Sequence, residues 1–207
     1  MARAAKSPAP ERVRAEIGKM ALDAQTVGEE ASLSRAMFAP LVGQTWPDRF
    51  RATTVNVRTG QFQVWDSSLR APLERAVAAN AAVPGIWPPI TINGERYMDG
   101  GVRSMLNADL AVGFGVVIAV SCFALTAPAA PENPLFSATN ASLLLELDVL
   151  RRSGATLAVI EPDAQFDALT NRGAAMMDVS LVPEAYLMGQ MKALVEAKAA
   201  RALWNAF

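Results

Sequence analysis

Asp99 is the residue whose type and neighbours best suit a role as an acid or a base, because it stands directly before two glycines, Gly100 and Gly101. A short strand-like segment is expected to follow the Pro88-Pro89 turn and to lead into Asp99. Glycine allows backbone conformations and close approaches that a Cβ atom would block. A carboxylate at the end of a strand, held against two glycines, is a common way to present an acid or a base to a cleft. The Asp-Gly pair is also an ordinary turn signal, so the chemistry depends on a longer pattern around it.

Histidine is absent from the 207 residues, which excludes a Ser-His-Asp or Cys-His site built from this chain alone. The side chain of Asp99 could still act as an acid or a base. A carboxylate with an ordinary pKa is a poor base in water. Partial burial and the loss of hydrogen bonds would raise the pKa of Asp99 and make it a better base.

Three blocks of sequence surround this aspartate: A-x-A-A-V-P-G-I-W-P-P at Ala79 to Pro89, G-x-x-Y-M-D-G-G-V at Gly94 to Val102, and N-A-D-L-A at Asn107 to Ala111. Over about Pro47 to Ser121 the chain resembles the patatin-like phospholipases, a family of serine lipid acyl hydrolases. In that family the aspartate of a D-G-[GA] motif pairs with a serine in a Ser-Asp dyad, and no histidine is required. The resemblance implies that Asp99 is the base of the dyad and that no metal or organic cofactor is needed. Gly100 and Gly101 are then the residues that support the motif.

The nucleophilic serine of that family lies upstream of these blocks in a G-x-S-x-G elbow, and a glycine-rich oxyanion loop lies further upstream still. None of the serines in this chain has glycine two residues before it and two residues after it. We therefore expect residues 1–207 to form one partial patatin-like domain without the oxyanion loop and the nucleophile elbow. The expected fold is α/β, a three-layer α/β/α hydrolase fold that is incomplete at its N-terminus.

Two functions follow from these observations. The first is a lipid acyl hydrolase, a phospholipase or esterase, of which this chain carries the catalytic aspartate and which is inactive without its serine. The second is a non-catalytic lipid-binding or interaction module descended from the same family. Acyl transfer to an acceptor other than water would use the same residues and stays open. The expected partners are a lipid or ester substrate and, through peripheral contact, a membrane; the oligomeric state is open.

The composition argues against several other classes of function. With 19 basic and 20 acidic residues and a net charge of −1, the chain offers no nucleic-acid surface and no polybasic membrane patch. Its one cysteine, Cys122, follows a β-branched run and is expected to be a buried, inert thiol. No Cys/His cluster suggests a metal site. The uncharged stretch from Leu110 to Pro131 is interrupted by glycine and proline, which favours a buried strand over a membrane span. Without a secretory signal, a cytoplasmic location is expected.

The elements that must position Asp99 follow from periodicity and from turn signals. Helices are predicted at Glu11 to Leu22, from a Thr26-x-x-Glu29 capping box to about Ala39, at Pro72 to Ala82, Asn107 to Val112, Leu143 to Arg152 and Pro183 to Trp204. Strands are predicted at Phe50 to Val57, Gln61 to Trp65, Val116 to Ser121 and Ala155 to Ile160, with a hairpin turn at Arg58-Thr59-Gly60. Two helix-strand alternations with continuous apolar strands favour a sheet covered on both faces.

Several other residues have a structural interpretation beside a functional one. Asn80, Pro84 and Gly85 are expected to belong to the scaffold. Trp87 could line an acyl pocket, but an aromatic ring beside two prolines more often packs against a core. Glu146 is expected to face solvent. The methionines suit a core or a lipid-facing surface, and the sequence does not decide between them: Met176, Met177, Met188 and Met191.

Overall fold

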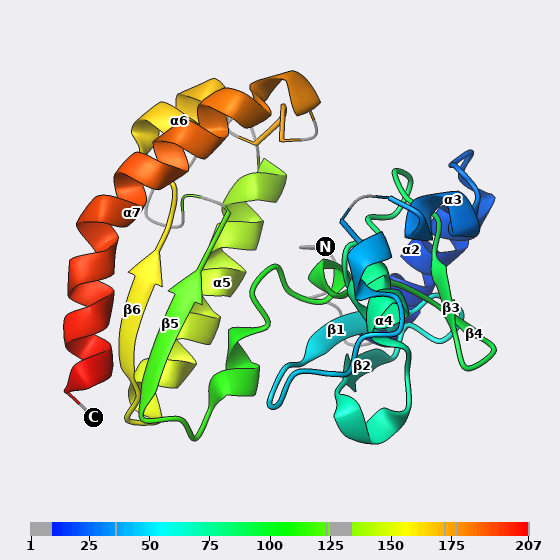
Figure 1. The fold of residues 1–207 in the computed structure, drawn as a ribbon, viewed down its shortest axis with the longest axis horizontal. Coiled ribbons are helices and arrows are strands. Elements are labelled where there is room, and N and C mark those ends of the chain that lie inside the picture. The colour runs from blue at the N-terminus through cyan, green and yellow to red at the C-terminus, as the bar shows by residue number, and fades with distance from the viewer. Residues whose placement is uncertain are drawn as a thin grey trace. The chain divides into compact units, whose positions relative to one another are not determined.

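The computed structural model describes residues 10–35, 37–122, 124, 134–171, 173–176 and 178–206, and within the segment 134–171 it describes side chains from residue 143 onward. The chain divides into two units, Met1–Asn107 and Ala108–Phe207, and each combines helices with a sheet (Figure 1). The predicted α/β class is therefore confirmed. The sequence suggested one sheet. The described strands instead form two, a four-stranded antiparallel sheet and a two-stranded parallel sheet.

The Met1–Asn107 unit contains a four-stranded antiparallel sheet in the order β2-β1-β4-β3. The elements of this unit are α2 (Pro10–Asp23), α3 (Glu29–Leu33), η1 (Ala39–Leu41), β1 (Ala52–Asn56), β2 (Phe62–Trp65), η2 (Ser67–Leu69), α4 (Leu73–Asn80), β3 (Ile90–Ile92), β4 (Glu95–Asp99) and η3 (Gly100–Val102). The first predicted helix, both early strands and the helix after Pro72 are confirmed in position.

The strand-like segment expected between Pro88-Pro89 and Asp99 is confirmed but forms two strands, β3 and β4, and the turn that divides it was missed although the sequence contains its signal. Asn93 and Gly94 connect β3 to β4 and have positive φ angles of 51° and 83°. Positive φ at both central residues is the requirement of a type I′ hairpin turn, for which Asn-Gly is a preferred pair. The strand β3 has only three residues, so the sequence analysis did not separate it from the strand that leads into Asp99. The hairpin fixes β4, and β4 ends at Asp99.

The helix α2 packs on the β1–β2 hairpin. Its Arg14 is buried and donates from Nε to the carbonyl oxygen of Gly60, at 2.7 Å, in the hairpin turn. Asn56 holds the same turn, since its Oδ1 accepts from the backbone N–H groups of Arg58 and Thr59, both at 3.0 Å. These contacts anchor the N-terminal helix to β1, the strand that pairs with β4.

The predicted capping box at Thr26 and Glu29 is wrong. The helix α3 has only five residues, Gly28 precedes it, and no side chain caps it. Thr26 donates instead to the carbonyl oxygen of Val27, at 3.1 Å. Glu29 does not bond back to the start of the helix. Its carboxylate accepts from the backbone N–H of Thr91 at 2.7 Å and pairs with Arg75 at 2.7 Å. A charged, partly buried network outweighs a local cap here.

Apolar side chains bury both faces of the antiparallel sheet. On β4, Met98 is fully buried beside Val55 and Val102, whereas the neighbouring Asp99 is half-buried on the other face. Alternation along a strand produces this difference, since successive side chains point to opposite faces. Trp87 packs against the core cluster on the α4 side, and the guanidinium of Arg35 lies 3.8 Å from the centre of its ring. Trp87 thus has the packing role expected for it.

The Ala108–Phe207 unit is built on two parallel strands, which the helix α5 connects. Its elements are η4 (Ala108–Ala111), β5 (Val116–Val120), α5 (Pro134–Arg152), β6 (Thr156–Ile160), α6 (Ala164–Leu169), η5 (Val179–Leu181) and α7 (Val182–Asn205). The strand interpretation of Val116–Val120 is confirmed. Within the described segments, no helix combines the length and the apolar character needed to cross a bilayer. The short helix α6 was missed; Asp163 caps it by accepting from Gln165 and Phe166.

Three predictions about this half of the chain are corrected. Cys122 is exposed, because β5 ends at Val120 before the thiol is reached. Glu146 does not face solvent freely: it is half-buried and accepts from the backbone N–H of Ala108 at 2.9 Å. That bond occupies the start of η4, the short helix that the sequence predicted to begin at Asn107. Asn107 instead has a φ of 49°, and its side chain turns back to Arg103 and Ser104.

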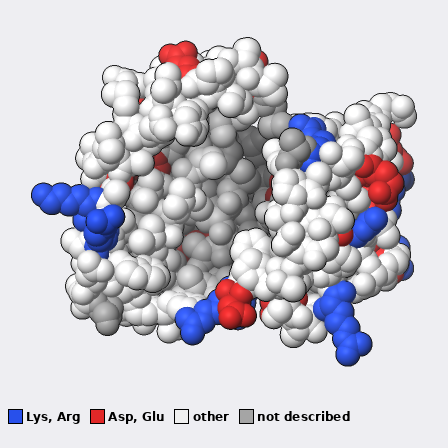
Figure 2. All heavy atoms as spheres, viewed as in Figure 1, with Lys and Arg blue, Asp and Glu red and all other residues white. Residues whose placement is uncertain are grey.

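The two units differ in how much apolar surface they bury. The long helix α7 has no buried residue, and Leu194 and Val179 are more than four-fifths exposed. Figure 2 shows one face on which Lys, Arg, Asp and Glu are sparse over the Ala108–Phe207 unit. An apolar and weakly charged surface of this kind is typical of a region that binds something.

Candidate functional site

The strand β4 carries Asp99 at its last position, opposite Thr54 of β1. The backbone N–H of Asp99 donates to the carbonyl oxygen of Ala82, at 3.1 Å, so the chain just after α4 also holds this residue. The side chain of Asp99 is half-buried. The sheet and the end of α4 therefore fix the backbone of Asp99 from two directions.

A tight turn follows Asp99 and begins the 3-10 helix η3. The Oδ1 atom of Asp99 accepts from the backbone N–H of Gly101 at 2.6 Å. Close approach to the backbone of β1 requires Gly100, and Gly101 leaves room for the carboxylate of Asp99. A Cβ atom on Gly100 would lie 2.5 Å from the carbonyl oxygen of Thr53 in β1, and one on Gly101 would lie 2.9 Å from Oδ1 of Asp99 itself. Real Cβ atoms do not tolerate such contacts without displacement of a neighbour.

Two asparagines hold the surroundings of this turn. Asn80, at the end of α4, donates from Nδ2 to the carbonyl oxygen of Thr53 at 2.8 Å and to its hydroxyl at 3.1 Å. Asn107 donates to the carbonyl oxygen of Ser104 at 2.7 Å and accepts from Arg103 at 2.8 Å. One residue from each of the three sequence blocks thus lies around the turn. Asn80 has the scaffold role expected for it, while Thr53 was missed and no signal in the sequence singles it out.

Burial raises the pKa of Asp99 from 3.8 to about 6, and the hydrogen bond from Gly101 opposes this rise. Within the described part of the chain, Asp99 makes no ion pair. The cause of the raised pKa is desolvation, which disfavours the charged form. A carboxyl group with a pKa near neutrality is suited to accept and return a proton during a reaction.

Among the described residues, no serine hydroxyl forms a hydrogen bond with the carboxylate of Asp99. Ser104 is the serine nearest to it in the sequence, and its hydroxyl is engaged as an acceptor for the backbone N–H groups of Leu106 and Asn107, at 3.2 and 3.0 Å. Among the described residues, no group of three or more His, Cys, Asp or Glu side chains could hold a metal ion. The turn can therefore supply a base and its support.

The comparisons with known proteins bear on the same part of the chain. Residues 4–112 match the family model described as patatin-like phospholipase, which is just over half of the sequence. The match includes β1, α4, β4 and the turn after Asp99. No curated protein matches the chain at a significant level.

Proposed function

The chain belongs to the patatin-like phospholipase family, and on that premise we propose that it carries the aspartate half of a lipid acyl hydrolase with a Ser-Asp dyad. The family implies a lipid substrate. The proposal requires a serine in a G-x-S-x-G elbow, which the 207 residues do not contain, and it places that serine on a segment of the protein outside them. In this proposal no metal or organic cofactor takes part.

One observation carries the proposal: Asp99 is a desolvated carboxylate at a strand end, with a pKa of about 6 and a backbone N–H as its hydrogen-bond partner. Structural aspartates on protein surfaces are normally stabilised in their charged form, which lowers the pKa. A raised pKa costs stability at neutral pH, so its presence in a fixed turn favours a role in proton transfer.

The proposed reaction uses Asp99 twice. As the serine oxygen attacks the ester carbonyl, the carboxylate takes the hydroxyl proton and then returns it to the departing alcohol, which leaves an acyl-enzyme. Water then loses a proton to Asp99 and attacks the acyl-enzyme, and the proton goes to the serine oxygen as the fatty acid leaves. Because the base must start deprotonated, the rate should fall as the pH is lowered through about 6.

The test is serine-probe labelling of the protein isolated from its own cells through a tag fused after Phe207. A fluorophosphonate probe is expected to label a product longer than 207 residues, and peptide mapping should place the label in a G-x-S-x-G sequence. Asp99→Asn should lower the labelling rate by about 10²–10⁴-fold, the usual contribution of a general base. Asp66→Asn is the matched control, because Asp66 accepts from the backbone two residues on in the same way; it should leave the rate unchanged.

The same measurement decides against the second candidate, a non-catalytic module. The observation that favours this candidate is the absence of a nucleophile elbow from the 207 residues. A tagged product of 207 residues that takes no label would establish it and reject the hydrolase. Labelling that survives Asp99→Asn would keep a hydrolase but remove Asp99 from its site.

Peripheral contact with a membrane is part of the proposal. The exposed side chains of Tyr186, Leu194 and Trp204 on α7 support it, since aromatic and aliphatic groups of this kind lie well at a lipid interface. Hydrolysis and transfer to another acceptor differ only in the nucleophile that attacks the acyl-enzyme, and product analysis separates them.

A further inference from the structure

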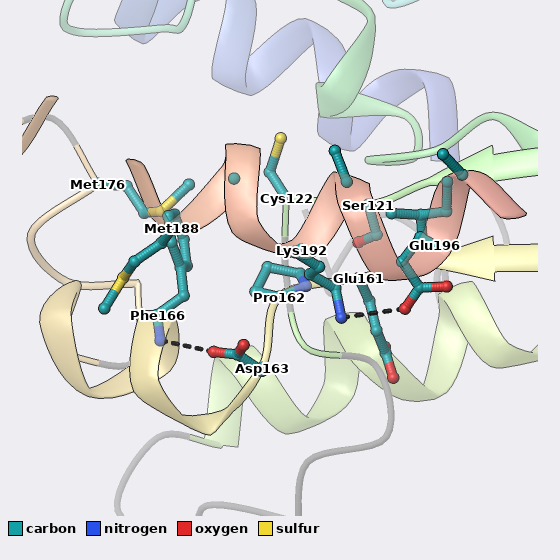
Figure 3. A pocket seen from close by; sticks show the side chains of 14 residues that line it. Ser121, Cys122, Glu161, Pro162, Asp163, Phe166, Met176, Met188, Lys192 and Glu196 are labelled. Carbon is teal, nitrogen blue, oxygen red and sulfur yellow. Dashed lines mark hydrogen bonds and ion pairs between the residues drawn. The ribbon is translucent and has the colours of Figure 1, made fainter. Parts of the chain in front are cut away.

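A cavity of about 370 Å³ lies within the Ala108–Phe207 unit, at the carboxyl ends of β5 and β6 and along one side of α7 (Figure 3). Ligands of open α/β sheets bind at the carboxyl ends of parallel strands, where the connecting loops leave room. We propose that this cavity is a binding site for a single aliphatic chain whose head group is uncharged or positively charged. The proposal concerns this unit alone and does not depend on Asp99.

The sequence of α7 creates the space. Gly189, Ala193 and Ala197 recur every fourth residue and line the cavity from one face of the helix. These residues have little or no side chain, and a Cβ atom added to Gly189 would meet no atom within 4 Å. All three residues are exposed, so the cavity is open to solvent along this face of α7, and larger residues at this spacing would narrow it.

One end of the cavity is lined by apolar and adaptable side chains. Phe166 of α6, Met176 and Met188 form one end of the cavity in Figure 3. Thioether side chains are flexible and polarisable and adjust to the shape of an apolar ligand. Their place in a ligand-sized cavity also favours a lipid-facing role for these two methionines over a closed core.

The shape of the site favours an extended chain over a compact ring. The lining residues of α7 run from Met188 to Ala197, which at 1.5 Å per residue spans about 14 Å along the helix. An aliphatic chain laid parallel to α7 would contact this whole length. Each methylene that it buries would contribute favourably and about equally.

The charges around the cavity select the head group. Lys192 pairs with Glu196 at 3.2 Å, so its ammonium already has a carboxylate beside it. Glu161 and Asp163 add two further carboxylates at the end of β6. Among the described residues that line the cavity, three carboxylates stand against one ammonium group, and this composition disfavours the anionic head of a free fatty acid and favours a quaternary ammonium or an uncharged head.

The chain contains its own reporter for this test. Cys122 is the only cysteine in the sequence, it is exposed, and it lines the cavity. A bound chain would shield the thiol, so the rate at which the purified protein reacts with a thiol reagent measures occupancy. We would use hexyl-, octyl-, decyl- and dodecyltrimethylammonium, and alkanoates of the same lengths, all below their micelle-forming concentrations.

The expected result is protection of Cys122 that strengthens with chain length, by about fourfold in apparent affinity per added methylene, until the chain exceeds the cavity. Alkanoates of the same length should protect less well. Protection that does not depend on chain length would overturn the site, and equal or better protection by alkanoates would overturn the head-group assignment.

Cavity-filling variants separate this site from adventitious binding of detergent-like molecules. Gly189→Trp should weaken protection by at least about tenfold, since the indole would occupy the space. Gly189→Ala is the matched control: it adds one methyl group, favours the helix, and should bind within about twofold of the parent chain. Ala193→Phe, one turn along the same face, provides a second filling variant should Gly189→Trp fail to fold. Protection that is undiminished in a folded filling variant would exclude the cavity as the site.

Discussion

The turns at Asp99 and Asp66 share one hydrogen-bonding pattern and give their carboxylates opposite properties. Each aspartate caps a short 3-10 helix by accepting from the backbone N–H two residues on, at 2.6 Å from Gly101 and 2.9 Å from Ser68. The pKa of Asp66 lies below its ordinary value, chiefly because the Ser68 hydroxyl also donates to it, whereas burial raises the pKa of Asp99 to about 6. Asp178 repeats the Asp66 pattern with Ser180.

The comparison shows what distinguishes a cap from a candidate base. In Asp66-Ser67-Ser68 a second donor stabilises the charged carboxylate, and the turn is open to solvent. In Asp99-Gly100-Gly101 the hydroxyl is absent, and Gly100 lets the turn lie close against Thr53 of β1, so that the carboxylate is partly desolvated. The difference between Ser67-Ser68 and Gly100-Gly101, together with burial, therefore separates a structural carboxylate from one that can exchange protons near neutral pH.

The largest effect is expected from breaking the close approach of the Asp99 turn to β1. Gly100→Ala would place a methyl group against the backbone of Thr53, so the free energy of unfolding should fall by about 3 kcal/mol, at the upper end for overpacking. Ser67→Ala, the equivalent exposed position of the other turn, should cost less than about 0.5 kcal/mol. Urea unfolding of both variants measures the difference. Equal losses would mean that the two turns are packed alike.

An effect of up to the same size, which depends on pH, is expected from removing the Asp99 charge. Because the pKa of Asp99 is higher in the folded chain, its contribution to stability is complete below pH 3.8 and is lost as the pH rises through about 6. Asp99→Asn keeps an oxygen to accept from Gly101 and removes this loss. At about 1.4 kcal/mol per pKa unit, it should stabilise the chain by up to about 3 kcal/mol at pH 8, and by less than about 1 kcal/mol at pH 4.

Asp66→Asn should act in the opposite direction. The pKa of Asp66 is lowered on folding, so its stabilising contribution is present above its ordinary pKa and the substitution removes it at pH 8. Unfolding curves at several pH values distinguish the two substitutions. A stabilisation by Asp99→Asn that is the same at pH 8 and pH 4 would show that its charge is not the cause.

The smallest effect is expected from Ser68→Ala, which removes the second donor but leaves the backbone N–H in place. The pKa of Asp66 should rise toward 3.8 without passing it, because the backbone N–H still donates and the turn remains open to solvent. Carboxyl titration followed by NMR measures this directly. A rise to the range of Asp99 would show that the missing hydroxyl, and not burial, accounts for the contrast between the two turns.

Local patterns predicted well those features that local chemistry controls. The helix α2, the β1–β2 hairpin and the parallel strands have periodicities or turn residues that leave few alternatives. The Thr26 cap failed because Glu29 found partners more than forty residues away, in α4 and β3. A rule about two residues three positions apart cannot detect such long-range competition.

The site shows the same limit. Asp99 and its glycines were found from their spacing, and the catalytic role of Asp99 stays a prediction. Thr53 was not found, because a threonine in a strand has no distinguishing neighbours; only the fold brings it against Gly100. Cys122 was placed in the core because an apolar run precedes it, and the prediction failed since the run ends two residues earlier.

The exposure of Cys122 has a consequence for the chemistry of the purified chain. With one thiol per molecule and that thiol exposed, air oxidation has a single disulfide available to it, between two copies of the chain. Such a covalent dimer would be joined through the rim of the cavity beside α7. In preparations kept without a reductant, this disulfide would block the proposed cavity site in both copies of the chain. The antiparallel sheet of the other unit would stay intact.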